Sequence, residues 1–286
     1  MIKKKVLLIF LLVVTLNIST TAQIKTNKQP KFNLTPKSAL STMKILPKVN
    51  IDAIETDTKR APYQFGTEIP IHYTLNNSGQ WQELDNGGRI WSLSLFSENA
   101  KGITIIYDDF YLPTGAELNL YSKTKNQRLG SFTNQNNKEN QQMATQPIIG
   151  DTIILELYEP KKARGLSRLS LEKAIHIYKD NFLTKTSSNF ENSGYCNIDV
   201  SCEQGDNWSA EIKSTAMYQI GTGFCSGTII NNSANNQVQY FLTAQHCIDG
   251  KTSSLGSAIF YYNWQRDSCD SDSIPTYDST VGAELI

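Results

Sequence analysis

The chain has 286 residues, in which 27 lysines and arginines are balanced by 27 aspartates and glutamates. The formal net charge of zero leaves no basic excess, so we expect neither nucleic acid nor an anionic lipid surface as the main partner. The length suffices for two ordinary domains, and a hydrophobic content of 39% excludes a wholly disordered chain.

The N-terminus has the pattern of a secretory signal. Three lysines at positions 3–5 precede an almost wholly apolar run, residues 6–16, which is shorter than the ~20 residues of a membrane-spanning helix. Small residues follow as far as Ala22, after which we expect cleavage. An uncleaved anchor helix is disfavoured because polar residues follow the apolar run at once. The sequence therefore predicts a signal peptide over residues 1–22 and a secreted or extracytoplasmic protein, with no membrane attachment after cleavage.

Residues 23–60 are rich in Lys, Thr, Asn and Pro and predict a flexible N-terminal segment. Residues 61–179 predict a β-rich domain, because runs of alternating apolar and polar residues are separated by turn signals. These runs lie at residues 89–96, 102–107, 117–121, 152–158 and 169–177. Residues 134–142 are nearly all polar and predict a solvated loop. Several short strands joined by turns indicate a β-sandwich.

The cysteines divide the chain. All five lie in its last third, at Cys196, Cys202, Cys225, Cys247 and Cys269. The polar residues 180–190 predict a linker, after which residues 191–286 form a module that export would supply with disulfides. Because the number of cysteines is odd, either one thiol is free or its partner lies outside this chain.

Two motifs in this module carry the chemistry. Residues 225–230 (CSGTII) are followed, after an Asn-rich turn, by residues 240–247 (YFLTAQHC). Together they resemble the chymotrypsin-like serine endopeptidases, in which a C-x-G-[ST] strand precedes a strand that ends in T-A-x-H-C. Residues 194–200 (GYCNIDV) and 261–265 (YYNWQ) are most similar to the secreted bacterial lysyl endopeptidases. The resemblance covers roughly residues 191–286, and the β-rich region upstream is more loosely similar to the propeptide of those enzymes.

The resemblance implies that His246 is the catalytic base. A serine hydroxyl is a weak nucleophile at neutral pH and needs a neighbouring imidazole to take its proton. A Cys225–Cys247 disulfide would hold this histidine at the end of a strand, and closing a loop of ~20 residues would contribute roughly 3 kcal/mol.

The resemblance also implies a second disulfide and a processing site. Cys202 would pair with Cys269. Cys196 would be left unpaired, because in the family its counterpart bonds to a cysteine of the second barrel, which this chain lacks. If the enzyme prefers lysine, we expect the linker to be cut after Lys185, with Lys179 as the second choice.

The sequence departs from the family downstream of His246. It contains no G-D-S-G-G or G-S-S-G segment for a nucleophile and no D-F-x-L-L-type strand for the acid. Asp270, Asp272 and Asp278 occur in a polar, Ser-rich stretch and are not assigned that role. Residues 191–286 are less than half of the roughly 200–250 residues that a two-barrel protease domain needs. The chain therefore resembles a fragment that stops within an apolar strand, with the base but neither the Asp nor the Ser of the triad.

Other interpretations of these residues are weaker. An isolated histidine is usually structural, which is how we interpret His72 and His176, but the motif around His246 reverses that default. A zinc site is disfavoured because there is no C-x-x-C pair and because adjacent His and Cys do not easily face one tetrahedral metal. Ser226 belongs to the C-x-G-[ST] strand and carries little weight as a nucleophile.

The sequence thus predicts an all-β chain: a β-sandwich-like propeptide domain followed by an incomplete chymotrypsin-type β-barrel. The function it favours is the secreted zymogen of a trypsin-like serine endopeptidase, for which the resemblance to lysyl endopeptidases implies lysine specificity. The enzyme would act as a monomer on protein or peptide substrates and need no metal and no cofactor. The alternative is a secreted β-sandwich binding or adhesion protein with a non-catalytic protease-like module. Exposed aromatic residues such as Trp81, Tyr107 and Tyr111 could supply its binding surface.

Overall fold

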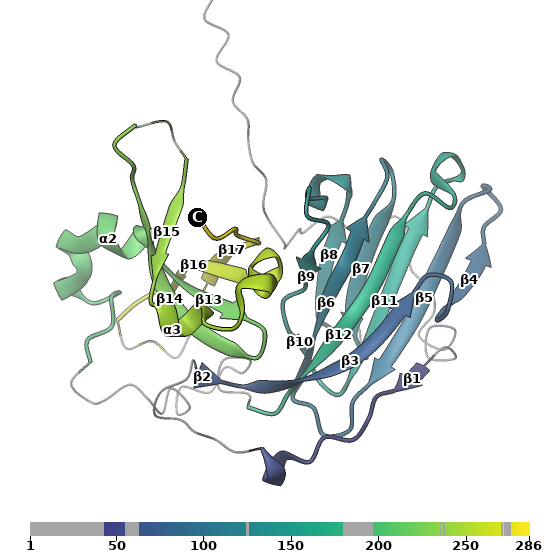
Figure 1. Cartoon of the computed structure of the whole chain (residues 1–286), viewed down its shortest axis with the longest axis horizontal. Helices are drawn as coiled ribbons and strands as arrows, with labels where there is room; N and C mark the ends of the chain where they lie inside the picture. The colour runs from purple at the N-terminus through teal and green to yellow at the C-terminus, as the bar shows by residue number, and fades with distance from the viewer. Residues whose placement is uncertain are drawn as a thin grey trace, which may run out of the picture.

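The computed structural model describes residues 43–54, 63–123, 126–179, 197–234, 236, 238–269, 271 and 276–286. The described chain is mostly β-structure, which confirms the all-β fold class (Figure 1). Its strands form three sheets, two of which face each other. The helical elements are short: η1 (Ile51–Ala53), η2 (Asn134–Asn136), η3 (Lys161–Ala163), η5 (Glu203–Trp208), α2 (Ser209–Ser214), α3 (Gln245–Ile248) and η6 (Thr252–Ser257). Among the described helices, none has the length and apolar character required to cross a bilayer.

Two sheets make the sandwich. The first has the order β1-β5-β11-β7-β8 with β4 beside β5, and its strands are β1 (Met43–Ile45), β4 (Gln80–Glu83), β5 (Arg89–Phe96), β7 (Glu117–Ser122), β8 (Arg128–Phe132) and β11 (Thr152–Glu159). The second has the order β10-β6-β12-β3 with β9 beside β6, and its strands are β3 (Gly66–Thr74), β6 (Gly102–Tyr111), β9 (Met143–Ala144), β10 (Ile148–Ile149) and β12 (Arg168–Ile177).

The alternating runs in the sequence became strands because each places its apolar residues on the face between the sheets. In β5 the side chains of Trp91, Leu93 and Leu95 are fully buried in the same apolar cluster as residues of β6, β7, β11 and β12. The run at residues 169–177 is part of β12, so the strand that its even spacing predicted is confirmed. A bulge between Leu171 and Lys173 shifts its register against β3 and β6.

Three details differ from the sequence-based expectations. The segment predicted to be flexible contains β1, which pairs in parallel with β5. Tyr107, expected to be exposed, is wholly buried, because β6 lies inside the second sheet and turns this ring into the core. The polar loop predicted to be solvated is exposed or half-buried throughout, but it also contacts the C-terminal part of the chain, where Lys138 and Gln142 donate hydrogen bonds to the carbonyls of Gly256 and Ser253.

The third sheet belongs mainly to the C-terminal module. Its order is β15-β14-β13-β16-β17, with β2 beside β14. The strands are β2 (Tyr63–Gln64), β13 (Thr215–Ile220), β14 (Gly223–Ile230), β15 (Tyr240–Thr243), β16 (Ile259–Gln265) and β17 (Thr276–Val281). The described strands of this sheet do not close into a barrel. Residues 284–286 follow β17 and were expected to lie in an apolar strand, but they are outside any strand.

The sandwich and the C-terminal module share one apolar core. Phe224, Ile259 and Tyr261 of the third sheet belong to the same buried cluster as the centre of the sandwich. A buried hydrogen bond from Nε2 of Gln146 to Oγ of Ser279, 2.8 Å long, joins the two parts inside this contact. The two parts therefore pack against each other through a buried interface, and are not merely connected by the linker.

His176 is a buried histidine at the end of β12. Its side chain is 1% exposed, Nδ1 lies 2.7 Å from the Ser97 hydroxyl, and Nε2 has no hydrogen-bond partner. Burial disfavours the charged imidazolium and lowers the pKa of His176. The residue is structural, since Ser97 is also buried and neither group reaches a cleft.

The position of His176 predicts how stability depends on pH. Because its pKa is lowered on folding, the unfolded chain binds a proton first as the pH falls below the ordinary histidine value of ~6.5. The free energy of unfolding should therefore decrease from about pH 7 to about pH 5. Denaturant titrations at each pH measure this. His176→Gln should flatten the dependence, whereas His72→Asn, at an exposed site, should retain it. An unchanged slope in His176→Gln would contradict the assignment.

Candidate functional site

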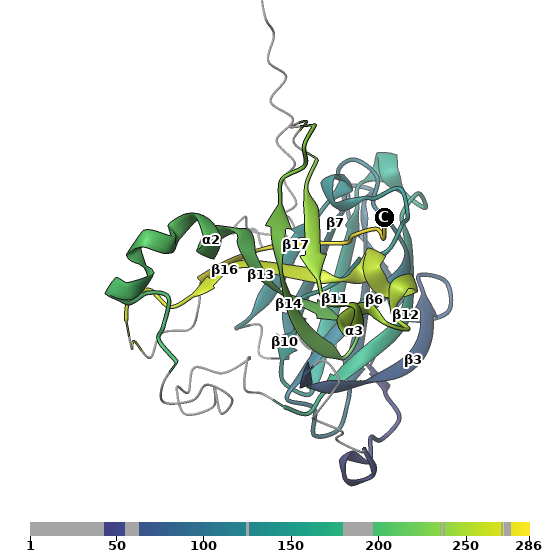
Figure 2. The ribbon, with the colours of Figure 1, turned by 60° about the vertical axis from the view of Figure 1, so that its left-hand side comes forward.

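The frame of the site is the pair of strands that carries both motifs. β14 and β15 run antiparallel, with Gly227 opposite Thr243 and Thr228 opposite Leu242. A Cβ at position 227 would collide with the Leu242 carbonyl oxygen and the Phe241 ring, so the glycine of the C-x-G-[ST] motif allows β15 to lie this close. Both motifs are thus parts of one hairpin, which extends away from the rest of the module (Figure 2).

Thr243 ties the end of β15 to its neighbours. Its hydroxyl donates to the carbonyl of Ser226 over 2.9 Å, and the hydroxyl of Tyr218, from β13, lies 3.0 Å from the same oxygen. Because both contacts are made by the first residue of T-A-x-H-C, the chain direction is fixed three residues before the histidine.

His246 lies on the single helical turn α3, directly after β15. The sequence placed it at the end of a strand, which is wrong in detail: the strand ends at Thr243, and Cys247 N–H donates to the Ala244 carbonyl to form the turn. A disulfide joins Cys225 to Cys247 with a Cα separation of 6.1 Å. Cys247 is buried and His246 is exposed, so the bridge anchors the inner side of the turn and leaves the imidazole outside.

A second disulfide joins Cys202 to Cys269, with a Cα separation of 4.4 Å. It links the start of η5 to the segment after β16. These are the two pairs that the family resemblance implies. Cys196, Lys185 and Ala22 lie outside the described residues, so the unpaired cysteine and the two processing sites stay predictions.

The cluster around His246 has the atoms of a metal site but not their chemistry. The Sγ atoms of Cys225 and Cys247 and a ring nitrogen of His246 all lie within 4.8 Å of one another. Both sulfurs are joined in the disulfide, however, and a zinc ligand must be a free thiolate. The short distances among these three residues therefore show only that the disulfide lies close to the His246 ring, and they do not indicate a metal site.

The other candidate residues do not complete a triad. In the described part of the chain, no hydrogen bond joins His246 to a carboxylate or to a serine hydroxyl. Ser226 is exposed on β14 and bonds to Thr243 through its carbonyl. Asp278 lies in β17 and accepts a 2.8 Å hydrogen bond from the Asn263 amide. Asp270 and Asp272 lie outside the described residues, so their relation to the histidine stays untested.

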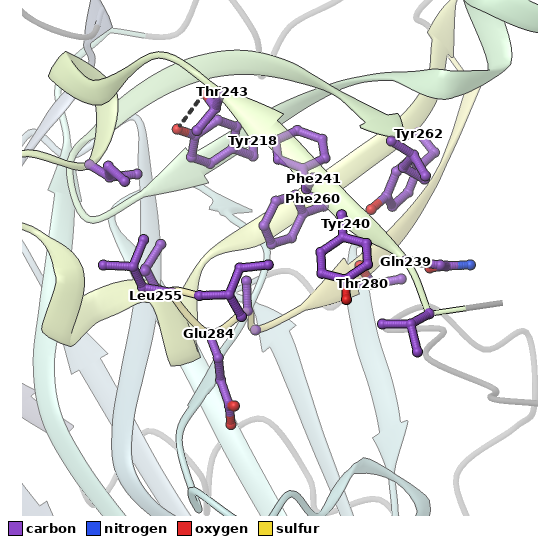
Figure 3. Close-up of a pocket in the computed structure, with 17 residues that line it drawn as sticks. Tyr218, Gln239, Tyr240, Phe241, Thr243, Leu255, Phe260, Tyr262, Thr280 and Glu284 are labelled. Carbon is purple, nitrogen blue, oxygen red and sulfur yellow. Dashed lines mark hydrogen bonds between the residues drawn. The ribbon is translucent and has the colours of Figure 1, made fainter. Parts of the chain in front are cut away.

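An aromatic hollow of about 450 Å³ lies on the side of the hairpin that faces the chain end (Figure 3). The Tyr218, Phe241 and Phe260 rings lie against one another there, with centroids 4.9–5.5 Å apart. They come from β13, β15 and β16 of the third sheet, and Leu255 and residues 282–286 also line the hollow. The hollow is the apolar inner face of this sheet, and among the described side chains that line it only that of Glu284 is charged.

Comparison with known proteins agrees with this geometry. The family described as "Lysyl endopeptidase, C-terminal domain" matches residues 190–286. The C-terminal module is lysyl endopeptidase-like. A lysyl endopeptidase of Pseudomonas aeruginosa is 30% identical over an alignment of 140 positions, which covers 45% of this chain and 30% of that relative. The chain thus matches less than a third of the relative's length.

Sequence reasoning missed how the sandwich reaches the lysyl endopeptidase-like module. β2 pairs with β14 at Gly223 and Phe224, next to the disulfide that holds His246. A two-residue strand has no period to detect, and its partner is more than a hundred residues away in the chain. The only local signal was the aromatic pair Tyr63 and Phe65 beside a Pro.

The Cys225–Cys247 disulfide should contribute measurably to stability. In the loop-entropy account, a bridge over a sequence separation of 22 residues contributes about 3 kcal/mol. The double variant Cys225→Ser/Cys247→Ser should lose this amount in chemical denaturation of the module. Cys202→Ser/Cys269→Ser, with a separation of 67 residues, should lose more, about 4 kcal/mol. No loss in the first variant would show that α3 is held by something other than the bridge.

Proposed function

We propose that this chain carries the propeptide and the histidine-bearing part of a secreted serine endopeptidase with a preference for lysine. The single observation that supports the role of His246 most strongly is its position. The imidazole stands exposed on a turn that a disulfide and the Thr243 hydrogen bonds fix to β14, within the region that matches the lysyl endopeptidase C-terminal domain.

In this proposal His246 acts as the general base. It would accept the proton of a serine hydroxyl as that oxygen attacks the scissile carbonyl, and would then donate the proton to the leaving amine. An imidazole open on one side suits the first step, and a turn with a fixed backbone suits the second, because the proton must be returned to a group at a defined distance. The 286 residues contain no G-D-S-G segment, so we propose that the hydroxyl does not come from this sequence.

The sandwich is proposed to act as a propeptide that stays docked on the module until the linker at residues 180–190 is cut. Its contacts support this role, since they reach the segment just after α3. Nζ of Lys138 donates a 3.1 Å hydrogen bond to the Gly256 carbonyl, and burial there lowers the pKa of Lys138 to about 8. A lysine is desolvated to this extent only where the surrounding surfaces pack closely.

The alternative, a binding protein, is not supported at the aromatic residues that were expected to form its binding surface. Tyr107 is in the core. The Trp81 ring is covered by the Arg89 guanidinium at 3.7 Å, and the guanidinium of Arg168 lies 4.7 Å from the Tyr111 ring. The three aromatic side chains therefore do not form one open platform. Protein substrates, secretion and a monomeric state remain parts of the protease proposal.

A hybrid enzyme tests the role of His246. Residues 190–286 would replace the matching segment of the Pseudomonas aeruginosa lysyl endopeptidase, which supplies the rest of a working protease. We expect the hybrid to cleave a lysyl peptide substrate and His246→Ala to lower kcat/KM by about 10⁶-fold, because loss of the base disables the triad.

The matched control is Gln245→Ala, an exposed neighbour on the same turn, which should leave kcat/KM unchanged. A hybrid that keeps its activity without His246 would refute the proposal.

A further inference from the structure

The first sheet of the sandwich is buried on both faces. On β5, the side chains of Trp91, Leu93 and Leu95 point between the two sheets into the main core, and the core residues of β7 and β11 do the same. The residues that alternate with them point to the outer face of the sheet. These outer residues are at most 4% exposed: Ser92, Ser94, Glu117, Asn119, Tyr121, Ile154 and Glu156.

The second sheet does not account for this burial, because it packs on the opposite side of the first sheet, where the core lies. Figure 1 shows the third, second and first sheets one after another across the molecule, with the first sheet outermost. An antiparallel sheet with one face on the core ordinarily leaves its other face to water. The outer face of the first sheet is therefore a covered surface at a place where solvent would be expected.

Two buried carboxylates set the charge of this outer face. Glu156 of β11 lies opposite Asn119 of β7, which places it diagonally beside Glu117 on the same face. Burial raises the pKa of Tyr121, and the carboxylates of Glu156 and Glu117 raise it further. Among the described residues of β5, β7, β8 and β11 on this face, Arg128 is the one cation. Since buried carboxylates are costly without cations or hydrogen-bond donors, a segment that covers the face should be basic.

The outer face also has an apolar part. Tyr121 and Ile154 lie directly opposite each other on β7 and β11 and form a small cluster that is separate from the main core. A segment that packs on them needs apolar side chains between its charged ones. The face thus fits an extended polypeptide that carries lysines or arginines around one or two apolar residues.

Three longer stretches after the predicted signal peptide lie outside the described residues, and only one has this composition. Residues 23–42 contain four lysines and no aspartate or glutamate, and Phe32 and Leu34 would lie on one side of an extended chain. Residues 55–62 contain two acidic and two basic residues, and residues 180–196 contain two acidic residues and one lysine. Charge therefore favours residues 23–42.

Residues 23–42 also end in a suitable place. β1 follows them directly and lies in the first sheet, beside β5. The distance across the sheet from β1 to β8 is about 19 Å at four strand spacings, whereas a segment of 20 extended residues spans about 65 Å. Residues 23–42 can therefore reach every part of the outer face.

We propose that residues 23–42 dock across the outer face of the first sheet and complete the sandwich. Their lysines would neutralise the two buried carboxylates, and Phe32 and Leu34 would pack on Tyr121 and Ile154. The outer face is then a binding surface for a basic, extended segment of the same chain. The proposal concerns the upstream domain and does not depend on protease activity.

Cross-linking of the chain from residue 23 onward identifies the segment that covers the face. A carbodiimide joins a carboxylate to a lysine in direct contact without a spacer, and mass spectrometry identifies the linked peptides. We expect links from Glu117 or Glu156 to lysines of residues 23–42. Links from these carboxylates to Lys59 or Lys185 instead would assign the cover to another segment and overturn the proposal.

The salt bridge between Glu68 and Lys173, with 3.0 Å between Oε2 and Nζ, is the internal control for this reaction. If this pair is linked while Glu117 and Glu156 are linked to no lysine of residues 23–42, the proposal is wrong.

Digestion of the folded chain with trypsin gives an independent measure. Glu117→Gln/Glu156→Gln removes both charges with little change of shape. It should speed cleavage after Lys28 by about tenfold, because the docked segment opens more often. The matched control is Glu172→Gln on β12 of the second sheet, which should leave the rate unchanged.

Where the glutamine variant does not fold, Phe32→Ser/Leu34→Ser changes only the segment and should speed cleavage after Lys28 to a similar extent. Equal cleavage rates in the substituted and unsubstituted chains would contradict docking on this face.

Discussion

The Cys225–Cys247 disulfide is the constraint on which the site depends. α3 is a single turn, too short to hold its own position, and it carries an exposed imidazole. The bridge fixes the buried side of this turn to β14, and the glycine at position 227 lets β15 run close enough for Thr243 to fix the other side. A base is useful only at a defined distance from its partner, so a covalent tie beside it suits general-base chemistry.

The second constraint is the apolar core that the sandwich and the module share. Phe65 belongs to it, with its ring against Phe224, its amide bonded to the module and its carbonyl bonded to the two residues that follow β12. An upstream domain that merely preceded the module would not need such contacts. The arrangement suits a propeptide whose docking and release are coupled to one junction, close to the candidate base.

The sequence predicted what depends on local pattern. Alternation gave the strands of the sandwich, and the two motifs identified His246 and its bridging cysteines. What it could not supply depends on distant partners. β1 is three residues long and is a strand only because β5 offers an open edge. Tyr107 is buried because its strand lies inside a sheet, and Lys138 is buried where its Nζ reaches a carbonyl of the distant module. The composition of a segment does not reveal which distant residues of the fold will bury it.

The central claim is that the bridge holds His246 where it can act, and the hybrid enzyme tests it most directly. Cys225→Ser/Cys247→Ser should lower kcat by about 10²-fold with little change in KM, because the base is misplaced while substrate binding is retained. Cys202→Ser/Cys269→Ser, measured where both variants are folded, should leave kcat nearly unchanged. An unaltered kcat without the Cys225–Cys247 bridge would contradict the account.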